Sequence, residues 1–169
     1  MTCIITACGW QLRGSNQLAQ SINSLYVTAE DAHGPLITEI KQQLTSSGVV
    51  IAERASDAPY TLAIIEERED KRTAGVGSDA LTSAYDLMLS VDYVVSDAQG
   101  TLLTPETTAT TSQTYNYSAG NASSSIQEEA TLIREMHRDL AQQLLRRLQT
   151  VIARQPAPTS ETPDGQTAP

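Results

Sequence analysis

Apolar residues alternate with polar ones in several stretches of the chain, which is the pattern of half-buried strands. The alternation is clearest in residues 81–95, where the odd-numbered positions from 85 to 95 are apolar or tyrosine and Asp86, Ser90 and Asp92 fall on the opposite face. Residues 24–30 show a shorter alternation. Two further strands are predicted at the following ranges: 49–55 and 60–67, separated by the turn-forming sequence SDAP.

Apolar residues three and four positions apart predict two helices. The first covers residues 35–47, with a proline in its first turn and a glycine just past its end. The second is longer and covers residues 123–155, with Ser125 and Glu128 at the spacing of a capping box. Its predicted apolar stripe consists of Ile126, Ile133, Met136, Leu140, Leu144, Leu148 and Val151.

These elements predict an α+β fold: a mixed, mainly antiparallel four-stranded sheet packed on one face by two helices, in the order β-α-β-β-β-α. The threonine-rich residues 104–117 fit either a solvent-exposed strand or a low-complexity loop. Residues 24–154 form the predicted folded domain. It follows a polar tether at residues 8–23 and precedes a tail, residues 155–169, whose composition predicts disorder.

The charge and cysteine content narrow the classes of function. Eleven basic residues stand against 20 acidic ones, for a formal net charge of -9, which argues against binding to a nucleic-acid backbone. No apolar run approaches the length of a membrane-spanning helix. The only cysteines are Cys3 and Cys8, both before the predicted domain, so a disulfide within the core is not expected.

The sequence Ile5-Thr6-Ala7-Cys8 has the pattern of a bacterial lipobox, in which small residues precede the cysteine that receives the lipid. Residues 1–7 are then the remnant of a lipoprotein signal peptide. They lack a charged n-region and a full apolar segment, so we expect that the start was assigned late or that the chain was shortened. The alternative is that Cys3 and Cys8 are ordinary small apolar residues at a frayed terminus.

Candidate catalytic and metal-binding residues are sparse. His33 and His137 lie far apart on polar stretches, and no metal-binding spacing or phosphate-binding loop is present. Asp86 and Asp92 have the residue type of a general acid and base, but a solvated or partner-facing sheet surface explains them better. The charged residues 66–72, EEREDKR, fit a solvated hairpin end. An enzyme is not expected.

Four segments in order resemble the LPS-assembly lipoprotein family, LptE (formerly RlpB). They are CGWQLRG, HGPLITEIKQQLTSSGV, LTSAYDLMLSVDYVV and LIREMHRDLAQQLLRRL, and the resemblance covers roughly residues 8–150. The family fold, a four-stranded sheet packed by two helices, agrees with the fold predicted from the periodicity.

The resemblance implies a lipoprotein on the periplasmic side of the outer membrane, with diacylglycerol and N-acyl lipid on Cys8 and no other cofactor. It implies a plug inside the LptD β-barrel that helps the barrel assemble and assists insertion of lipopolysaccharide (LPS) into the outer leaflet. Where family members carry basic residues for LPS, this chain has GSDALTS and NASSS. The nearest basic candidates are Arg68, Lys71 and Arg72.

Two other functions remain open at the level of the sequence. One is a monomeric, periplasm-facing lipoprotein that binds a small ligand or peptide at its sheet edge. The other is a small lipid-anchored hydrolase that uses scattered Ser and Asp residues.

Overall fold

The computed structural model describes residues 22–78 and 81–155. The predicted signal-peptide remnant at residues 1–7, the tether up to residue 21 with Cys8, and the tail from residue 156 onward lie outside the described residues.

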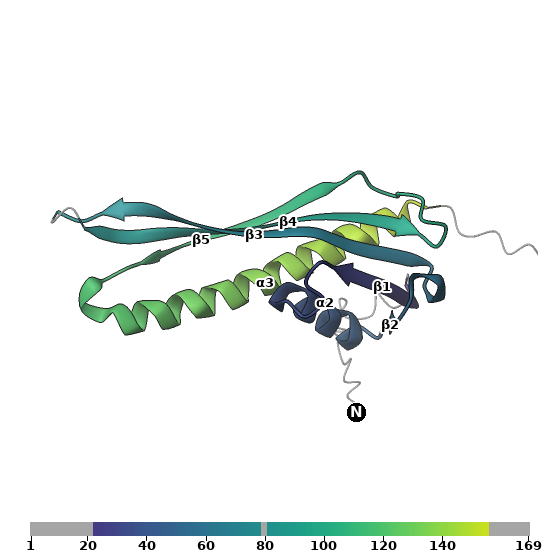
Figure 1. The fold of residues 1–169 in the computed structure, drawn as a ribbon, viewed down its shortest axis with the longest axis horizontal. Coiled ribbons are helices and arrows are strands. Elements are labelled where there is room, and N and C mark those ends of the chain that lie inside the picture. Colours follow the sequence, from purple (N-terminus) through teal and green to yellow (C-terminus); the bar gives the residue numbers. More distant parts are fainter. Residues whose placement is uncertain (1–21, 79–80, 156–169) are drawn as a thin grey trace, which may run out of the picture.

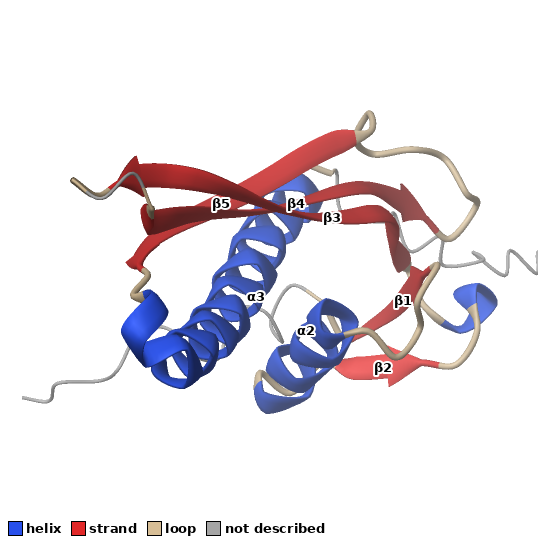
Figure 2. Ribbon diagram, turned by 60° about the vertical axis from the view of Figure 1, so that its left-hand side comes forward, coloured by secondary structure: helices blue, strands red, loops and turns tan. Residues whose placement is uncertain are grey.

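A mixed five-stranded sheet forms one layer of the molecule, and two helices lie against one of its faces (Figures 1 and 2). The order of strands across the sheet is β2-β1-β3-β4-β5. In chain order the elements are β1 (Ser24–Ala29), α2 (Pro35–Ser46), β2 (Val50–Ala52), the 3-10 turn η1 (Ala55–Asp57), β3 (Tyr60–Val76), β4 (Thr82–Asp97), β5 (Thr107–Asn116), the 3-10 turn η2 (Ala119–Asn121) and α3 (Ala122–Ala153).

The predicted α+β class with two helices on one face is correct, but the predicted number and order of strands are wrong. The strands β2 and β3 do not pair with each other, because both run parallel to β1 and lie on either side of it. The antiparallel part is the meander β3-β4-β5. The order is therefore β-α-β-β-β-β-α.

The fifth strand is β5, in the segment for which the sequence left strand and loop open. Ten residues of β5 pair with β4, from Thr107 opposite Tyr93 to Asn116 opposite Ala84. Threonine favours extended backbone, and Ala109 and Tyr115 are buried on the helix side of the sheet. These buried residues distinguish β5 from a loop.

The strand β3 is much longer than predicted, because residues 66–72 are not a hairpin end. They continue the pairing with β4, after a β-bulge between Ile64 and Glu66. Ile65 is the extra residue of this bulge. A bulge shifts the alternation of side chains by one position, so the odd-numbered residues face the helices beyond it, whereas the even-numbered Leu62 and Ile64 do so before it.

The core lies between the sheet and the two helices. Leu36, Ile37, Ile40 and Leu44 of α2 are buried in it. The buried face of α3 begins at Met136 and consists of Met136, His137, Leu140, Ala141, Leu144, Leu145, Leu148 and Ile152, with Ser125 also buried near the start of the helix.

Two details predicted for α3 are wrong. Ile126 is 65% exposed, because the N-terminal turns of α3 extend beyond the apolar core. The predicted capping box is absent, since the helix begins at Ala122 and Ser125 lies inside it. None of the described helices is both long and apolar enough to cross a membrane.

Candidate functional site

The side of the β3-β4-β5 meander that points away from both helices carries a row of polar and charged side chains on each of its three strands. We call it the open face. Its central part is polar or charged apart from Met88, although no described helix covers it, whereas Ala63, Ile65, Ala84 and Val94 make its two ends apolar. The residues of the central part are Glu66, Arg68, Asp70 and Arg72 on β3, Asp86, Met88, Ser90 and Asp92 on β4, and Thr108, Thr110, Ser112 and Thr114 on β5.

Asp92 is the most buried carboxylate of the open face. Only 9% of it is exposed, because Arg68 and Thr108 flank it from the two neighbouring strands. The Arg68 guanidinium lies 2.6 Å from Asp92 Oδ2, and the Thr108 hydroxyl donates a hydrogen bond to Oδ1. The bond from Arg68, and then that from Thr108, lower the pKa of Asp92. Asp92 therefore stays ionised and links three strands.

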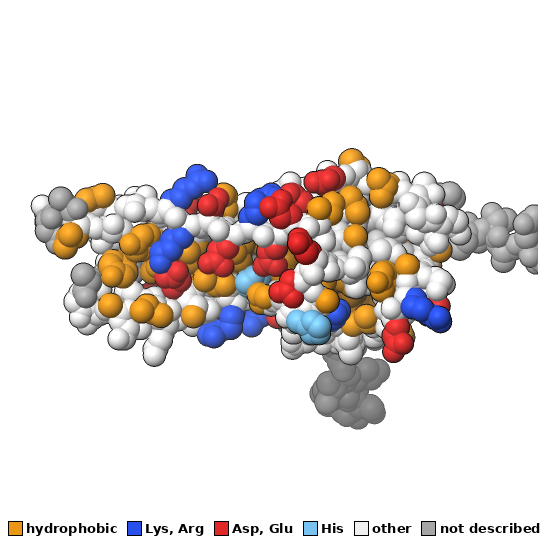
Figure 3. Space-filling model, viewed as in Figure 1, with side chains coloured by type: hydrophobic (Ala, Val, Ile, Leu, Met, Phe, Trp, Pro, Cys, Tyr) orange, Lys and Arg blue, Asp and Glu red, His pale blue; other side chains and the backbone are white. Residues whose placement is uncertain are grey.

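The other charged side chains of the open face also have polar partners, on their own strand or on the next one. Arg68 reaches Glu66 at 2.6 Å as well as Asp92, and Thr114 donates a hydrogen bond of 3.2 Å to Asp86. In the space-filling view, blue and red side chains lie side by side over the long strands (Figure 3). The open face therefore combines high polarity with few unpaired charges.

On the opposite face of the sheet, Lys71 links β3 to α3. Its Nζ lies 2.6 Å from Glu129 Oε2, which also accepts a 2.6 Å hydrogen bond from the Tyr115 hydroxyl. The same Nζ lies 4.4 Å from the centroid of the Tyr85 ring. Burial raises the pKa of Glu129, but the bonds from Lys71 and then Tyr115 outweigh it, so the pKa lies below its usual value.

A second link between β3 and α3 joins Glu67 to His137. The imidazole Nε2 lies 2.7 Å from Glu67 Oε1, and His137 is only 5% exposed. Its Nδ1 has no hydrogen-bond partner among the described residues. His137 is thus buried although its neighbours in the sequence are polar, and the bulge in β3 turns the Glu67 carboxylate toward it.

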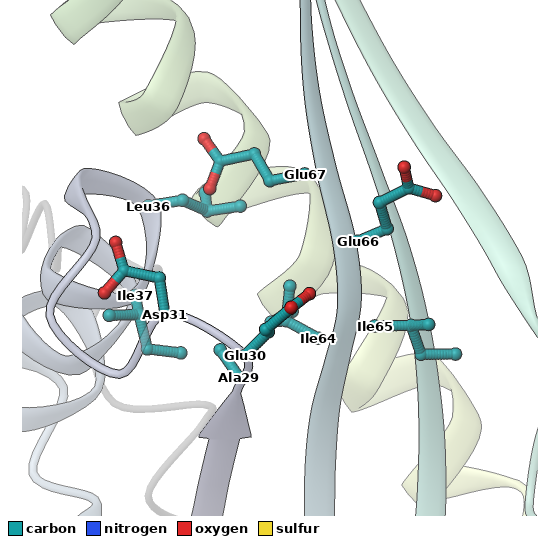
Figure 4. A pocket seen from close by; sticks show the side chains of 9 residues that line it. All are labelled: Ala29, Glu30, Asp31, Leu36, Ile37, Ile64, Ile65, Glu66 and Glu67. Atoms are coloured by element: carbon teal, nitrogen blue, oxygen red, sulfur yellow. The ribbon is translucent and has the colours of Figure 1, made fainter.

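A cavity of about 320 Å³ lies where β1 ends beside the bulge of β3. Figure 4 shows Glu67 pointing toward Leu36 of α2, whereas Ile65 and Glu66 both point to the other side of β3. Glu30 and Asp31 also line the cavity. In the described part of the chain, however, no group of His, Cys, Asp and Glu residues has the arrangement to hold a metal ion.

The three basic residues suggested by the resemblance do not share one face. Arg68 and Arg72 lie on the open face, and Lys71 lies on the helix side. Arg72 is the most accessible of them, with its side chain 68% exposed and one contact of 3.4 Å to Asp70. Lys71 is held by Glu129, and Arg68 by Asp92 and Glu66.

The carboxylates considered as an acid–base pair are not adjacent. Asp86 and Asp92 are six residues apart on one strand, which corresponds to roughly 20 Å. This separation exceeds that of a catalytic carboxylate pair, about 5–10 Å. His33 lies in the exposed connection after β1, where its backbone N–H donates to Asp31.

Sequence reasoning missed the pairing of Asp92 with Arg68 and of His137 with Glu67. Both pairs join residues far apart in the chain and depend on the bulge. A usable signal was present in β5, where hydroxyl side chains recur at Thr108, Thr110, Ser112 and Thr114. This period of two places them together on one face of a strand.

A comparison with protein families supports the resemblance seen in the sequence. The model of the lipopolysaccharide-assembly family LptE matches residues 22–148, which include every strand and most of α3. The chain belongs to the LptE family. The family is one of lipopolysaccharide-assembly lipoproteins and not of enzymes.

Curated relatives carry the same family name. The LPS-assembly lipoprotein LptE of Yersinia pestis is 30% identical over 172 residues, covering 97% of this chain and 79% of that protein. LptE of Photorhabdus laumondii is 33% identical over 93 residues. That second match covers 54% of this chain and spans about half, 51%, of the Photorhabdus protein.

Solved structures show the same LptE fold. Rare lipoprotein B from Shewanella oneidensis matches with a TM-score of 0.69, covering 78% of this chain and 97% of that one. The sequence identity is 18%, so this likeness concerns the fold alone. As an LptE lipoprotein the chain has a role in lipopolysaccharide assembly and is associated with the outer membrane.

Proposed function

We propose that this chain is the lipoprotein subunit of the LPS translocon. In this proposal it sits as a plug in the lumen of the LptD β-barrel, helps the barrel assemble, and assists insertion of LPS into the outer leaflet. Membership of the LptE family supports the proposal. The structural observation that carries it is the open face, because a broad, polar and internally paired sheet surface suits a water-filled barrel interior better than a lipid surface.

Cys8 is the proposed attachment point of the membrane anchor. A diacylglycerol and an N-acyl chain on Cys8 bury enough methylene groups, at about 0.8 kcal/mol each, for stable anchoring. Gly9 follows the cysteine, and the absence of an aspartate there favours the outer membrane under the bacterial sorting rule. The folded domain then lies on the periplasmic side.

Arg68, Lys71 and Arg72 are the proposed contacts for LPS phosphates. Arginine recognises phosphate through paired hydrogen bonds. Arg72 has the least to give up, since its one contact is the 3.4 Å pair with the exposed Asp70. Arg68 and Lys71 would have to exchange carboxylate partners at 2.6 Å for phosphate. We therefore place the first phosphate contact at Arg72.

The proposal is tested by purifying the tagged full-length protein from detergent-solubilised outer membranes and identifying what remains bound by mass spectrometry. We expect a stoichiometric large β-barrel protein and a tri-acyl mass on Cys8. If the protein emerges alone, the translocon role is refuted and a monomeric lipoprotein that binds a small ligand or peptide takes its place.

A variant pair tests whether the open face makes the contact. Met88→Lys places a long charged side chain at the centre of the open face, next to Asp70 in the pairing register. Gln42→Lys adds the same charge to the exposed side of α2. We expect the first variant to lose co-purifying barrel and the second to retain it. Equal retention by both would place the contact elsewhere.

A further inference from the structure

A pocket of about 330 Å³ lies where β3 begins and β4 ends, next to the C-terminal end of α3 (Figure 1). Tyr60 is the first residue of β3, and Asp97 is the last residue of β4; both line the pocket. Gln155, two residues beyond the end of α3, lines it as well. The pocket therefore brings together two neighbouring strands and the last residue of the chain that the structure describes.

The wall of this pocket is apolar and contains an aromatic ring. Tyr60 and Leu103 are half-buried and pack against the hydrophobic core, and Pro59 and Ala98 add further apolar surface. Among the described residues, no group forms a hydrogen bond with the Tyr60 hydroxyl. Proteins bind proline-rich segments in aromatic-lined grooves of this kind, and a tyrosine hydroxyl at the rim of such a groove can donate to the backbone of the segment.

The chain leaves α3 at this pocket. The N–H of Arg154 donates to the C=O of Val151 at 3.2 Å, and the N–H of Gln155 donates to the C=O of Ile152 at 3.0 Å, so the last turn continues as far as the pocket wall. Pro156 follows. Proline has no N–H and disfavours the helical conformation at the residue before it, so the helix ends here. The segment after Gln155 therefore starts from the pocket itself.

The sequence of that segment matches the chemistry of the pocket. Residues 156–160 read PAPTS, with two prolines in the first three positions and no charge. Prolines at this density favour the extended polyproline II conformation. The acidic residues Glu161 and Asp164 come later in the chain, and the carboxylate of Asp97 at the pocket would repel them. The pocket therefore suits the uncharged, proline-rich start of the tail rather than its acidic part.

We propose that residues 156–158 dock in this pocket, with the ring of Pro158 against the ring of Tyr60. Polyproline II rises about 3.1 Å per residue, so three residues span about 9 Å from Gln155, which is on the scale of a pocket of about 330 Å³. The Tyr60 hydroxyl donates a hydrogen bond to a backbone carbonyl of the docked segment. The segment thereby joins the C-terminal end of α3 to the ends of β3 and β4.

Covalent attachment favours this segment over a separate proline-rich peptide. The segment starts at Gln155 on the pocket wall, so its docking avoids the loss of translational and rotational freedom that a second molecule would incur. A short tether corresponds to a local concentration in roughly the millimolar range, which a free peptide would have to exceed. This inference does not depend on the proposed function, because the pocket residues do not belong to the open face.

NMR spectroscopy of the isotopically labelled full-length protein tests the docking directly. We expect nuclear Overhauser effects between the ring protons of Tyr60 and the ring protons of Pro158, and none between Tyr60 and Pro163. The Tyr60 ring should also shift the resonances of Pro158 upfield of those of Pro163. If no nuclear Overhauser effect joins Tyr60 to Pro158, the proposal is overturned.

A double-mutant cycle measured by urea unfolding gives a second test. Pro158→Ser and its control Pro163→Ser are each made in the parent and in Tyr60→Leu, which keeps an apolar side chain but removes the ring and the hydroxyl. In the parent we expect Pro158→Ser to raise the equilibrium constant of unfolding about threefold to tenfold, and Pro163→Ser to leave it unchanged. In Tyr60→Leu neither should have an effect. Equal effects of Pro158→Ser in the two backgrounds, or equal effects of the two serine variants in the parent, refute the docking.

Discussion

At the scale of single residues, Asp92 shows how a polar side chain becomes part of the sheet rather than of its surface. It faces away from the core, yet its neighbours on β3 and β5 bury it to 9% exposure. The alternation in residues 81–95 predicted the face on which Asp92 lies. Its partner Arg68 could not be predicted, because the pairing depends on the register of β3 after the bulge.

Because the pKa of Asp92 is lowered in the folded chain, the unfolding free energy depends on pH. The folded chain holds this carboxylate ionised at a pH where the unfolded chain, with a pKa of about 3.9, already binds a proton. The ionised Asp92 contributes its full share of the unfolding free energy above the unfolded pKa. This share is lost as the pH falls from the unfolded pKa toward the lower pKa of the folded chain. We expect the difference in unfolding free energy between the parent and Asp92→Asn to shrink in that range.

Urea unfolding at neutral pH and at about pH 3.5 measures this difference. Asp70→Asn is the matched control, since Asp70 lies on the same face with its side chain 55% exposed and only a 3.4 Å contact to Arg72. Exposed ion pairs of this kind contribute little to the unfolding free energy. A difference between the parent and Asp92→Asn that stays constant with pH would contradict the role given to Arg68 and Thr108.

At the scale of elements, the sequence predicts the helices and strands in which apolar residues recur at one constant spacing. The prediction is incomplete where that spacing is interrupted. The helix α2 and the strand β4 are close to prediction because each keeps one period throughout. The strand β3 is predicted only as far as its apolar half. Beyond Ile65 its face toward α3 carries Glu67, Glu69, Lys71 and Thr73, so no apolar alternation marks it as a strand.

Deletion of Ile65 tests whether the bulge itself adds to stability. Without this residue, Ile64 and Glu66 follow each other and stay opposite Tyr93 and Asp92, so Leu62 and Ile64 still face the core and Glu67 still faces α3. We expect the deletion to lower the unfolding free energy by no more than roughly 1–2 kcal/mol, from the lost local bend and twist. Ile65→Ala, which keeps the bulge and truncates a side chain that is 40% exposed, is the control and should change little. Urea unfolding compares the two variants, and a failure of the deletion variant to fold would contradict the continuous register.

A pair of truncations in α3 tests where its apolar face begins. Leu140 is fully buried and Ile126 is 65% exposed, although the helical spacing puts both in one stripe. We expect Leu140→Ala to lower the unfolding free energy by about 2–5 kcal/mol and Ile126→Ala by less than about 0.5 kcal/mol. Thermal and urea unfolding compare them. A large effect at Ile126 would show that the N-terminal turns of α3 are part of the core.

At the scale of the whole molecule, one layer of helices leaves the sheet with two unlike faces. The helix side contains the apolar core and the links from Glu67 and Lys71 to α3. The open face contains the polar residues that the proposed function uses. The periodicity of apolar residues correctly predicted the α+β class, but neither it nor the composition could distinguish a barrel plug from a free lipoprotein, because both have a polar outer surface.

Cys8 should be needed for the location of the protein and not for its fold, since it precedes every described element. We expect Cys8→Ala to leave the melting temperature unchanged and to move the protein from the membrane fraction to the soluble periplasmic fraction. Cys3→Ala is the control and should remain with the membrane. Membrane retention of Cys8→Ala would refute the anchor, and loss of folding would show that the tether belongs to the domain.

The position of β1 has a consequence for the order in which the molecule folds. Both neighbours of β1 come later in the chain, and its pairing with β3 extends to Ile64. The meander of β3, β4 and β5, in contrast, closes by short connections between consecutive strands. Because long loops are slower to close than short ones, we expect the meander to form first. Although β1 is the first strand to be synthesised, it is then the last to pair, and its backbone hydrogen-bonding groups stay unpaired until β2 and β3 have been made.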